Sequence, residues 1–402
     1  MFLDIYEREL RGGLEARSML VLHDVNIDLL HMIDEGGLLK ALESYRRGYR
    51  DSDGVSDIVH RILKLASTTG GEIMIDEVRE DLNNFKPFLQ KNSRRIMFTL
   101  GGNAGNASVA ISRLGGSAWI STAVRDDKYG RWIKTYLEEN GVRTDLLRML
   151  KGGREQAMTF GIEIPGKDRG FLNDSTDIRE FRVAEIHESF DGVLMLGLHK
   201  LKSGLDRAVE FVRDMRGKSR IISDGGDYSS MSRENLELLF EIFRNTDLCC
   251  MNETELALCL NALGMKAREG RDAVSVFDNA EDLRAALGLN IINLHTELFS
   301  FDLSKDTLCV LPTLEPRRIT VKTGLGDAYV SGKSMGFLQG GSGLRGLALG
   351  NTNAVVKLEK GDFPTMKEVM RRSKTIRIKE RGREEVEALL RVLKADSAEI
   401  KI

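Results

Sequence analysis

The sequence contains few of the residues that mark disulfide-linked, secreted or nucleic-acid-binding proteins. Among 402 residues there are 4 cysteines, 5 prolines and 2 tryptophans, and the formal net charge is −2. The cysteines show no Cys-x-x-Cys spacing and three of them lie in apolar patterns, which favours reduced core thiols over disulfides or metal ligands. A nearly balanced charge gives no general attraction to nucleic acid or to anionic membranes.

Long hydrophobic runs are also absent. The most apolar segments, such as residues 193–198, have the length of a strand and are far too short to cross a bilayer. The chain begins with acidic residues at positions where a signal peptide has a basic segment and then an apolar one. We therefore expect a cytoplasmic protein whose partners are neither membranes nor nucleic acids.

Strand and helix patterns alternate regularly from residue 184 onwards, which predicts a mostly parallel, doubly wound α/β sheet whose strands end at one cleft. Residues 33–95 and 151–183 depart from this alternation, with helical patterns and short strands joined by charged or glycine-rich links. The predicted architecture is a large α/β domain of residues 18–32, 96–150 and 184–402, and a smaller α+β lid domain formed by the two other segments.

A glycine turn joins a short β-branched strand to a helix within residues 319–329. Gly324 and Gly326 allow the N–H groups of the turn, including that of Leu325, to point towards an anion, and the helix dipole adds to the attraction. Asp327, in the first helical turn, is close enough to accept a proton from an attacking hydroxyl, as in phosphoryl transfer. Taken alone, the same residues also fit an ordinary strand-to-helix turn with an acidic cap.

The nearby Gly-Lys-Ser of residues 332–334 looks like the end of a P-loop. That motif needs its first glycine at the position of Asp327, and the intervening residues are helical in character. We therefore exclude a P-loop and predict that Lys333 is a solvent-facing helix residue.

Two polar segments are candidates for holding a substrate. Asn26 and Asp28 follow the first buried strand, where open α/β sheets place ligands, and both could bind sugar hydroxyls or simply form a polar loop. Gly101 and Gly102 open a later helix and allow close approach of a ligand to the backbone. The amide of Asn103, the next residue, can both donate to and accept from a hydroxyl.

A candidate metal site follows another predicted strand. Asn252 caps the next helix and Glu255 lies in its first turn, which is good capping chemistry by itself. The functional alternative is that Glu255 and Asn252 hold Mg²⁺ through its water shell beside nucleotide phosphates. Asp224, at the end of a neighbouring predicted strand, would supply a second carboxylate.

Other polar residues are candidates for nucleotide or phosphate contacts. His295 and Thr296 end a strand, where the histidine is either structural or reaches a nucleotide. Asn353 lies in a helix whose small-residue face is expected near an adenine. Arg179 belongs to a charged segment that is by default a solvated surface, yet it would meet a phosphate on the substrate if the substrate carries one.

Four of these motifs, in this order, resemble the ribokinase-like superfamily of sugar kinases. They are the Asn-x-Asp after the first strand, the Gly-Gly-Asn-Ala-Gly helix start, the Asn-x-x-Glu and the Gly-x-Gly-Asp, and the resemblance covers most of residues 18–361. It implies that Asp327 is the catalytic base, that the amides of residues 324–326 form the anion hole, and that Glu255 organises Mg²⁺. It also implies sugar contacts by Asp28 and by the Gly-Asn pair that precedes Ala104.

Within the superfamily, the chain is most similar to the ADP-dependent glucokinase and phosphofructokinase branch. Residues 251–256 are similar to that branch's Asn-Glu-x-Glu-Leu, and residues 292–296 are similar to its strand ending in His-Thr. The resemblance implies Mg²⁺-dependent transfer from ADP to glucose, fructose 6-phosphate, ribose 1-phosphate or a related acceptor, as in glycolysis. The alternatives are an ATP-dependent ribokinase-type carbohydrate or nucleoside kinase, and a non-catalytic sugar or nucleotide sensor.

Overall fold

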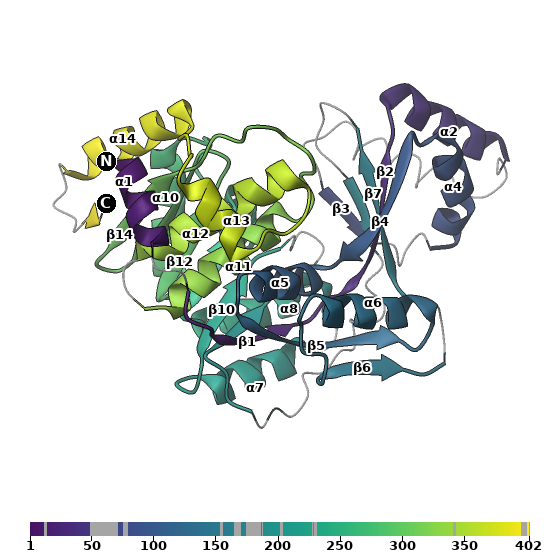
Figure 1. Ribbon diagram of the computed structural model, residues 1–402, viewed down its shortest axis with the longest axis horizontal. Helices are drawn as coiled ribbons and strands as arrows, with labels where there is room; N and C mark the ends of the chain where they lie inside the picture. The colour runs from purple at the N-terminus through teal and green to yellow at the C-terminus, as the bar shows by residue number, and fades with distance from the viewer. Residues whose placement is uncertain are drawn as a thin grey trace.

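The computed structural model places the described part of the chain in two β-sheets with helices packed around them (Figure 1). The described residues are 1–11, 14–48, 71–74, 79–152, 156–164, 170–173, 186, 188–201, 204–226, 228, 231–340, 343–394 and 400–401. Arg179 and much of the predicted lid segment 151–183 lie outside them.

Within these residues, the larger sheet has ten strands in the order β15-β14-β13-β12-β11-β10-β9-β1-β5-β6. Neighbouring strands pair in parallel from β6 to β12, whereas β13 runs antiparallel to both β12 and β14. The predicted mostly parallel sheet is therefore confirmed. The strands are β1 (Ser18–Leu22), β5 (Ser117–Arg125), β6 (Leu147–Leu150), β9 (Gly192–Met195), β10 (Arg220–Asp224), β11 (Leu248–Met251), β12 (Ile291–His295), β13 (Phe299–Ser304), β14 (Leu308–Pro312) and β15 (Ile400–Lys401).

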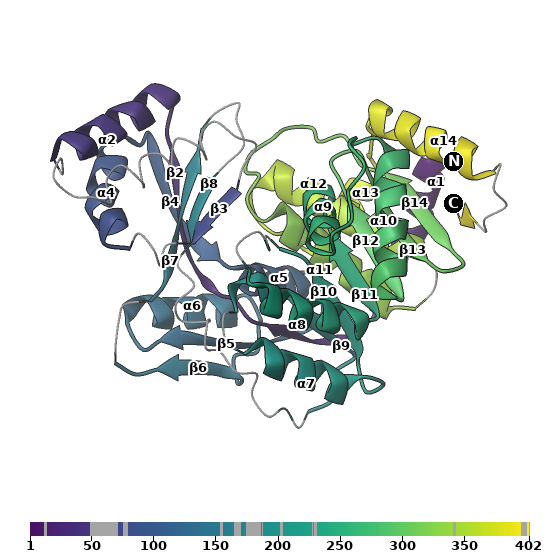
Figure 2. The ribbon, with the colours of Figure 1, turned by 180° about the vertical axis from the view of Figure 1, so that it is seen from behind.

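Helices cover both faces of this sheet, which explains its sequence. The side chains of residues 19–22 in β1 are all fully buried, so β1 is a continuous apolar run without alternation, as in parallel strands covered on both faces. Helices α5, α11 and α12 lie on the face turned towards the viewer in Figure 1, and α7, α8 and α9 lie on the face seen in Figure 2. The doubly wound arrangement predicted from the sequence is thus present.

The helices around the larger sheet begin and end as follows: α1 (Phe2–Leu10), α5 (Asn103–Arg113), α6 (Lys128–Glu139), the 3₁₀ helix η2 (Leu198–Lys200), α7 (Leu205–Met215), α8 (Arg233–Arg244), α9 (Glu253–Ala262), α10 (Ala273–Leu287), α11 (Leu325–Leu338), α12 (Gly343–Lys360), α13 (Met366–Ser373) and α14 (Glu380–Lys394). Several start with a side-chain cap, such as Asp127 before α6 and Thr365 before α13. These caps satisfy backbone N–H groups that have no partner inside the helix.

A smaller sheet stands beside the larger one, in the strand order β3-β8-β7-β2-β4 over the described residues. Its strands are β2 (Asn26–Met32), β3 (Gly71–Met74), β4 (Arg95–Gly101), β7 (Met158–Glu163) and β8 (Gly170–Asn173), and two helices, α2 (Glu35–Gly48) and α4 (Arg79–Asn92), accompany it. Leu29 and Phe160 on one face pack with Leu42, Tyr45 and Phe85 of the helices. Because side chains alternate along a strand, the polar residues at even positions of β2 face the opposite way.

The sharp turn at His23 decides which sheet β2 joins. His23 directly follows β1 and has a φ of 108°, an unusual value for a residue with a side chain. The chain changes direction there, so that β2 and β4 pair with each other in the smaller sheet. The sequence boundaries placed both strands with the larger domain, in segments 18–32 and 96–150, because a histidine gives no sequence signal for a positive φ.

Close packing between α11 and α12 buries a lysine that the sequence analysis placed in solvent. Lys333 is fully buried, and its Nζ lies 2.5 Å from the Asp302 carboxylate. A Cβ at Gly346 would lie 2.7 Å from that nitrogen, and a Cβ at Gly332 would lie 2.8 Å from the Leu349 carbonyl oxygen. The prediction for Lys333 was therefore wrong, because glycines on the facing helix leave room for its side chain and Asp302 neutralises its charge.

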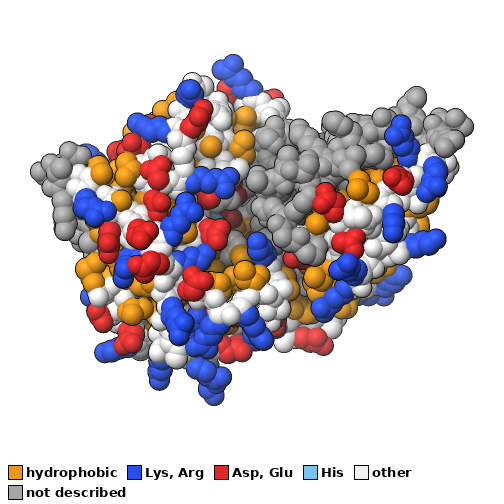
Figure 3. Space-filling model, turned by 90° about the horizontal axis from the view of Figure 1, so that it is seen from above, with side chains coloured by type: hydrophobic (Ala, Val, Ile, Leu, Met, Phe, Trp, Pro, Cys, Tyr) orange, Lys and Arg blue, Asp and Glu red, His pale blue; other side chains and the backbone are white. Residues whose placement is uncertain are grey.

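The remaining expectations concern thiols and membranes. All four cysteines are buried and free, in agreement with the predicted core thiols. In the part of the chain that the structure describes, every helix is too short or too polar to cross a membrane. Positive and negative side chains are interspersed on the face seen from above (Figure 3).

The tight contact at Gly332 predicts a stability effect. A Gly332→Val substitution should lower the free energy of unfolding by about 2 kcal/mol, because the new side chain meets backbone atoms of α12 that cannot move aside. Gly36→Ala is the matched control, since a Cβ there lies 3.5 Å from Asp34 Oδ1, an ordinary contact. Chemical denaturation of both variants gives the comparison, and wild-type stability for Gly332→Val would contradict the described helix packing.

Candidate active site

The glycine turn predicted to bind an anion forms the start of α11. Gly324 caps the helix in the left-handed region, with a φ of 73°, which a residue with a side chain would adopt only with strain. A Cβ at Gly326 would meet no described atom within 4 Å, so the backbone there is open to a ligand. Free N–H groups at a helix start together with the helix dipole attract an anion.

Asp327, in the first turn of this helix, is held by two amides from α5. Asn103 Nδ2 donates to its Oδ1 at 3.0 Å, and Asn106 Nδ2 donates to its Oδ2 at 2.8 Å. The residue is only 6% exposed. Burial raises the pKa of Asp327 to about 6, although the hydrogen bonds from the two asparagines act in the opposite direction. A carboxyl group with a pKa near neutrality can both accept and release a proton, as a general base requires.

Two cavities lie near Asp327. The first, here called the sheet-side cavity, has a volume of about 420 Å³ and is lined by β4, by Asn106 of α5 and by Thr323 before the glycine turn. The second, the helix-side cavity, has a volume of about 340 Å³ and is lined by Gly326 and Leu325 of α11, by His295 and by part of α12. Asp327 is buried and lines neither cavity, but its neighbour Gly326 lines the helix-side cavity and its hydrogen-bond partner Asn106 lines the sheet-side cavity.

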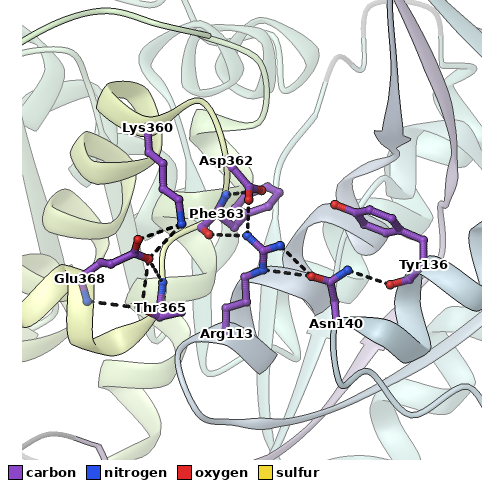
Figure 4. Close-up of polar contacts among 8 residues, drawn as sticks. All are labelled: Arg113, Tyr136, Asn140, Lys360, Asp362, Phe363, Thr365 and Glu368. Carbon is purple, nitrogen blue, oxygen red and sulfur yellow. Dashed lines mark hydrogen bonds and ion pairs between the residues drawn. The ribbon is translucent and has the colours of Figure 1, made fainter.

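One wall of the sheet-side cavity is fixed by Arg113, at the end of α5 (Figure 4). Its guanidinium contacts Asp362 at 2.5 Å and donates to the Phe363 carbonyl at 2.7 Å, and it also binds the side chain of Asn140. Phe363 and Asp362 line the cavity. The loop after α12 is therefore tied to the same helix that supplies the two amides to Asp327.

The polar residues at the start of β2 lie against the glycine pair, so the two segments that are candidates for holding a substrate are adjacent. A Cβ at Gly101 would lie 1.9 Å from Asp28 Oδ1 and 2.4 Å from Asn26 Oδ1, so only glycine fits there. Gly102 has a φ of 79° and caps α5, the helix that Asn103 begins. Asn26 donates to Thr159 of β7, and Oδ1 of Asn26 is buried without a partner among the described residues. An unsatisfied buried oxygen of this kind is a position where a ligand hydroxyl would bind.

Asn252 and Glu255 form the capping box that the sequence analysis offered as the plain alternative. Asn252 Oδ1 accepts from the backbone of Thr254 and Glu255, and Glu255 Oε2 accepts from the backbone of Asn252 at 2.9 Å. This role leaves the carboxylate of Glu255 at the end of β11, close to Gly225. Glu255 can therefore cap the helix and also serve as a carboxylate of a metal site.

Asp224 completes a group of carboxylates. Burial raises the pKa of Asp224 well above its ordinary value, and the negative charges of Glu255 and Asp327 raise it further. Its Oδ1 is buried and has no hydrogen-bond partner within the described residues. These residues contain no cluster of three or more His, Cys, Asp or Glu side chains that would enclose an ion by itself. Two carboxylates with an unsatisfied oxygen instead suit Mg²⁺, which keeps several waters.

The structure places two of the residues predicted to contact a nucleotide at the helix-side cavity and a third away from it. His295 and Thr296 line the helix-side cavity, and the His295 ring stacks on Tyr329 with centroids 4.6 Å apart. Burial lowers the pKa of His295 to about 4, so its ring is neutral at pH 7. Asn353 is instead fully buried and donates to the Ala328 carbonyl at 2.7 Å. Asn351, two residues earlier, lines the cavity.

Sequence reasoning missed Asn106 and Lys200. Asn106 follows Asn103 by three residues, and this spacing places both side chains on the same helix face, so the signal was available. Lys200 lies 97 positions from Asn103 but donates to it at 3.3 Å. Only the fold brings these two residues together, since nothing in the local sequence marks Lys200.

These features define the class of protein. A doubly wound sheet, a glycine turn at a helix start and a buried aspartate in the first turn of that helix are the components of a ribokinase-like phosphotransferase whose acceptor is a hydroxyl group. A family model for the "pfkB family carbohydrate kinase" matches residues 67–364. The chain therefore belongs to the pfkB family of carbohydrate kinases.

Curated relatives and solved structures agree with this assignment. The 5-dehydro-2-deoxygluconokinase of Clostridium botulinum is 22% identical over 318 residues, which are 74% of this chain and 90% of that enzyme. The enzyme of the same name from Clostridium tetani is 26% identical over 121 residues, so the chain spans only 34% of its length. The nucleoside kinase of Methanocaldococcus jannaschii has a TM-score of 0.61 at 15% identity, covering 90% of this chain and 99% of that one. Arabidopsis thaliana ribokinase, with ribose and ATP, has a TM-score of 0.63 at 14% identity, covering 90% and 99%.

The comparisons support the superfamily resemblance but not the ADP-dependent branch within it. None of these four proteins is named as an ADP-dependent kinase. The short motifs that suggested that branch, around residues 251–256 and 292–296, form a helix cap and a strand end. Both are elements that any ribokinase-like sheet contains, so they do not discriminate between the two donors.

The two amides on Asp327 predict how its pKa responds to mutation. Asn106→Ala should raise the pKa of Asp327 from about 6 by about one to two further units, because a hydrogen bond to a charged group is lost in a buried place. The titration can be followed by ¹³C NMR of labelled aspartate carboxyl carbons, with Asp327→Asn identifying the signal. Asn279→Ala, which removes a buried amide from the Arg268 backbone, should leave the titration unchanged. An unchanged midpoint in Asn106→Ala would show that the amide does not stabilise the carboxylate.

Proposed function

We propose that this chain transfers the terminal phosphoryl group of ATP to a hydroxyl group of a carbohydrate. The observation that carries the proposal is the position of Asp327, a buried carboxyl group with a pKa of about 6 whose hydrogen-bond partner Asn106 lines the sheet-side cavity and whose neighbour Gly326 lines the helix-side cavity. The acceptor occupies the sheet-side cavity and the nucleotide occupies the helix-side cavity. The transferred group then passes beside the open N–H groups at Gly324 and Gly326.

Asp327 acts as the general base in this mechanism. It takes the proton of the acceptor hydroxyl as the oxygen attacks the terminal phosphorus, and it is anionic and ready to do so above a pH of about 6. The N–H groups of residues 324–326 stabilise the charge on the transferring phosphoryl group. Asn103 and Asn106 keep the carboxylate oriented towards the acceptor.

Mg²⁺ fits this mechanism, and Glu255 and Asp224 are the residues that would hold it. Oδ1 of Asp224 is buried without a hydrogen-bond partner among the described residues, and burial and the negative charge of Glu255 both raise the pKa of Asp224. A bound Mg²⁺ would neutralise negative charge on the nucleotide phosphates. Asn252 would support it through the helix cap.

The donor proposed here differs from the one that the sequence analysis favoured. The pfkB family is a family of ATP-dependent enzymes, and the related structure of Arabidopsis ribokinase is named with ATP. This supports ATP, the sequence alternative, over ADP. A neutral His295 stacked on Tyr329 offers a flat, uncharged wall in the helix-side cavity that suits a purine base.

The acceptor is proposed to be a carbohydrate. The curated relatives act on 5-dehydro-2-deoxygluconate by name, and the Arabidopsis enzyme is named with ribose. Leu100 of β4 lines the sheet-side cavity. Residues that directly follow it, or that pair with β4 from β2, would bind the hydroxyl groups of the carbohydrate at the edge of this cavity: Asn26, Asp28 and the Gly101–Gly102 backbone. The role of Arg179 with a phosphorylated acceptor stays a prediction, because that residue lies outside the described residues.

Substitution of the base tests the mechanism. Asp327→Asn should lower kcat at least about a hundredfold, which is about 3 kcal/mol of barrier, while the dissociation constant of the nucleotide changes little. Steady-state kinetics and calorimetric titration measure the two quantities. Asp306→Asn, on the turn between β13 and β14, is the control and should behave as wild type. Near-normal turnover in Asp327→Asn would remove Asp327 from the proposed role.

The donor is tested by direct competition. Purified protein is given each of a panel of sugars and sugar acids with either Mg-ATP or Mg-ADP, and with excess chelator in a third arm. We expect at least about tenfold higher kcat/KM with ATP and loss of turnover with chelator. A preference for ADP would restore the ADP-dependent assignment, and absence of product from every sugar would favour a non-catalytic sensor.

A further inference from the structure

A buried ion pair lies behind the catalytic aspartate. Lys200 Nζ is 2.7 Å from Asp24 Oδ2, and the two side chains are 4% and 2% exposed. The same nitrogen donates to Asn103 Oδ1 at 3.3 Å, and Asn103 Nδ2 in turn donates to Asp327 Oδ1 at 3.0 Å. The four residues thus form one continuous chain of polar contacts that ends at the base.

The surrounding backbone holds the ion pair in place. Asp24 follows the strained residue His23, and its carboxylate and its carbonyl both accept from the N–H of Ala104 at the start of α5. Lys200 ends η2, which begins after Gly197. A Cβ at Gly197 would lie 2.6 Å from Asp24 Oδ1. The loop can therefore approach Asp24 this closely only with glycine at that position.

The ion pair has a clear effect on the amide of Asn103. A primary amide has one oxygen, which accepts, and one NH₂ group, which donates, and the two ends have similar shapes. An ammonium group on one side and a carboxylate on the other leave one favourable orientation, with the oxygen towards Lys200 and the NH₂ towards Asp327. Without Lys200, the amide could rotate and present its oxygen to the carboxylate, which would repel it.

We propose that Lys200 is a positioning residue for the phosphoryl transfer, acting on Asp327 through the Asn103 amide. Asp24 anchors the ammonium and keeps it out of the substrate's reach, so Lys200 itself does not bind an anionic substrate. This inference rests on the proposed function for its kinetic consequences, because the affected group is the proposed base.

The electrostatic consequence has a definite sign. The positive charge of Lys200 lowers the pKa of Asp327, whereas burial and the charge of Asp24 raise it. Removal of Lys200 alone therefore raises the pKa of Asp327. Because the base must be ionised, the acidic limb of the kcat/KM profile should move to higher pH.

A double-mutant cycle tests the route through Asn103. Lys200→Met and Asn103→Ala should each lower kcat about tenfold to a hundredfold, because the base is misplaced. The double variant should lose no more than the worse single variant, since both substitutions remove the same chain of contacts. If the fall in kcat of the double variant equalled the product of the two single falls, the proposal would be overturned, because Lys200 would then act independently of Asn103.

Lys333→Met is the matched control for the loss of a buried ion pair. It breaks the pair with Asp302, which makes no described contact with Asp327, so it should lower the melting temperature without moving the acidic limb. If Lys200→Met does not fold because Asp24 is left unpaired, Asp24→Asn with Lys200→Met removes both charges and keeps the acceptor for Ala104. That variant should still show the loss of kcat, and wild-type turnover would overturn the proposal.

A readout without turnover separates this proposal from the proposed function. The ¹³C titration of Asp327 in the Lys200→Met protein should show a midpoint above that of wild type, whether or not any sugar is phosphorylated. An unchanged midpoint would overturn the positioning role. Inactive wild-type protein with a shifted midpoint would count against the proposed function and support the link between Lys200 and Asp327.

Discussion

The proposed site depends on keeping one carboxylate, that of Asp327, charged in a buried place. A lone buried carboxylate would take up a proton and lose its value as a base. Two asparagine amides from α5 and the positive end of α11 oppose this, so that the pKa of Asp327 is near neutrality and not far above it. The crossing of α5 over the start of α11 is therefore the contact around which the fold is arranged.

Glycines at four positions let the backbone turn, or let backbone or charged groups approach one another closely, in this fold. Gly101 makes room for Asp28 and Asn26, and Gly324 adopts the positive φ that starts α11. Gly332 and Gly346 let α11 and α12 approach closely enough to enclose Lys333. At Gly101, Gly332 and Gly346 a side chain would block the close approach of backbone or charged atoms, so only glycine fits. The resulting contacts pack α11 closely against its neighbours.

Buried ion pairs give this chain specificity at a cost in desolvation. Lys333 with Asp302 and Lys200 with Asp24 each place two charges in a dry environment, where mutual attraction only roughly balances lost hydration. The first pair joins α11 to β13 and serves packing. The second lies behind the proposed base, where a fixed charge can orient a neighbouring amide. The two Lys–Asp pairs have the same chemistry, but their proposed roles differ because they contact different residues.

The sequence by itself determined the class of fold and pointed to the glycine turn and Asp327 as a candidate site. Periodic apolar runs predicted the parallel sheet, and the glycine turn before Asp327 predicted an anion site, because strand period, glycine geometry and helix capping are local properties. Tertiary structure decided what depends on distant residues. It decided that β2 leaves the larger sheet at His23, that Lys333 is buried, that Asn353 faces inwards and that Lys200 reaches Asn103. These outcomes follow from packing between segments far apart in the chain, which no local pattern encodes.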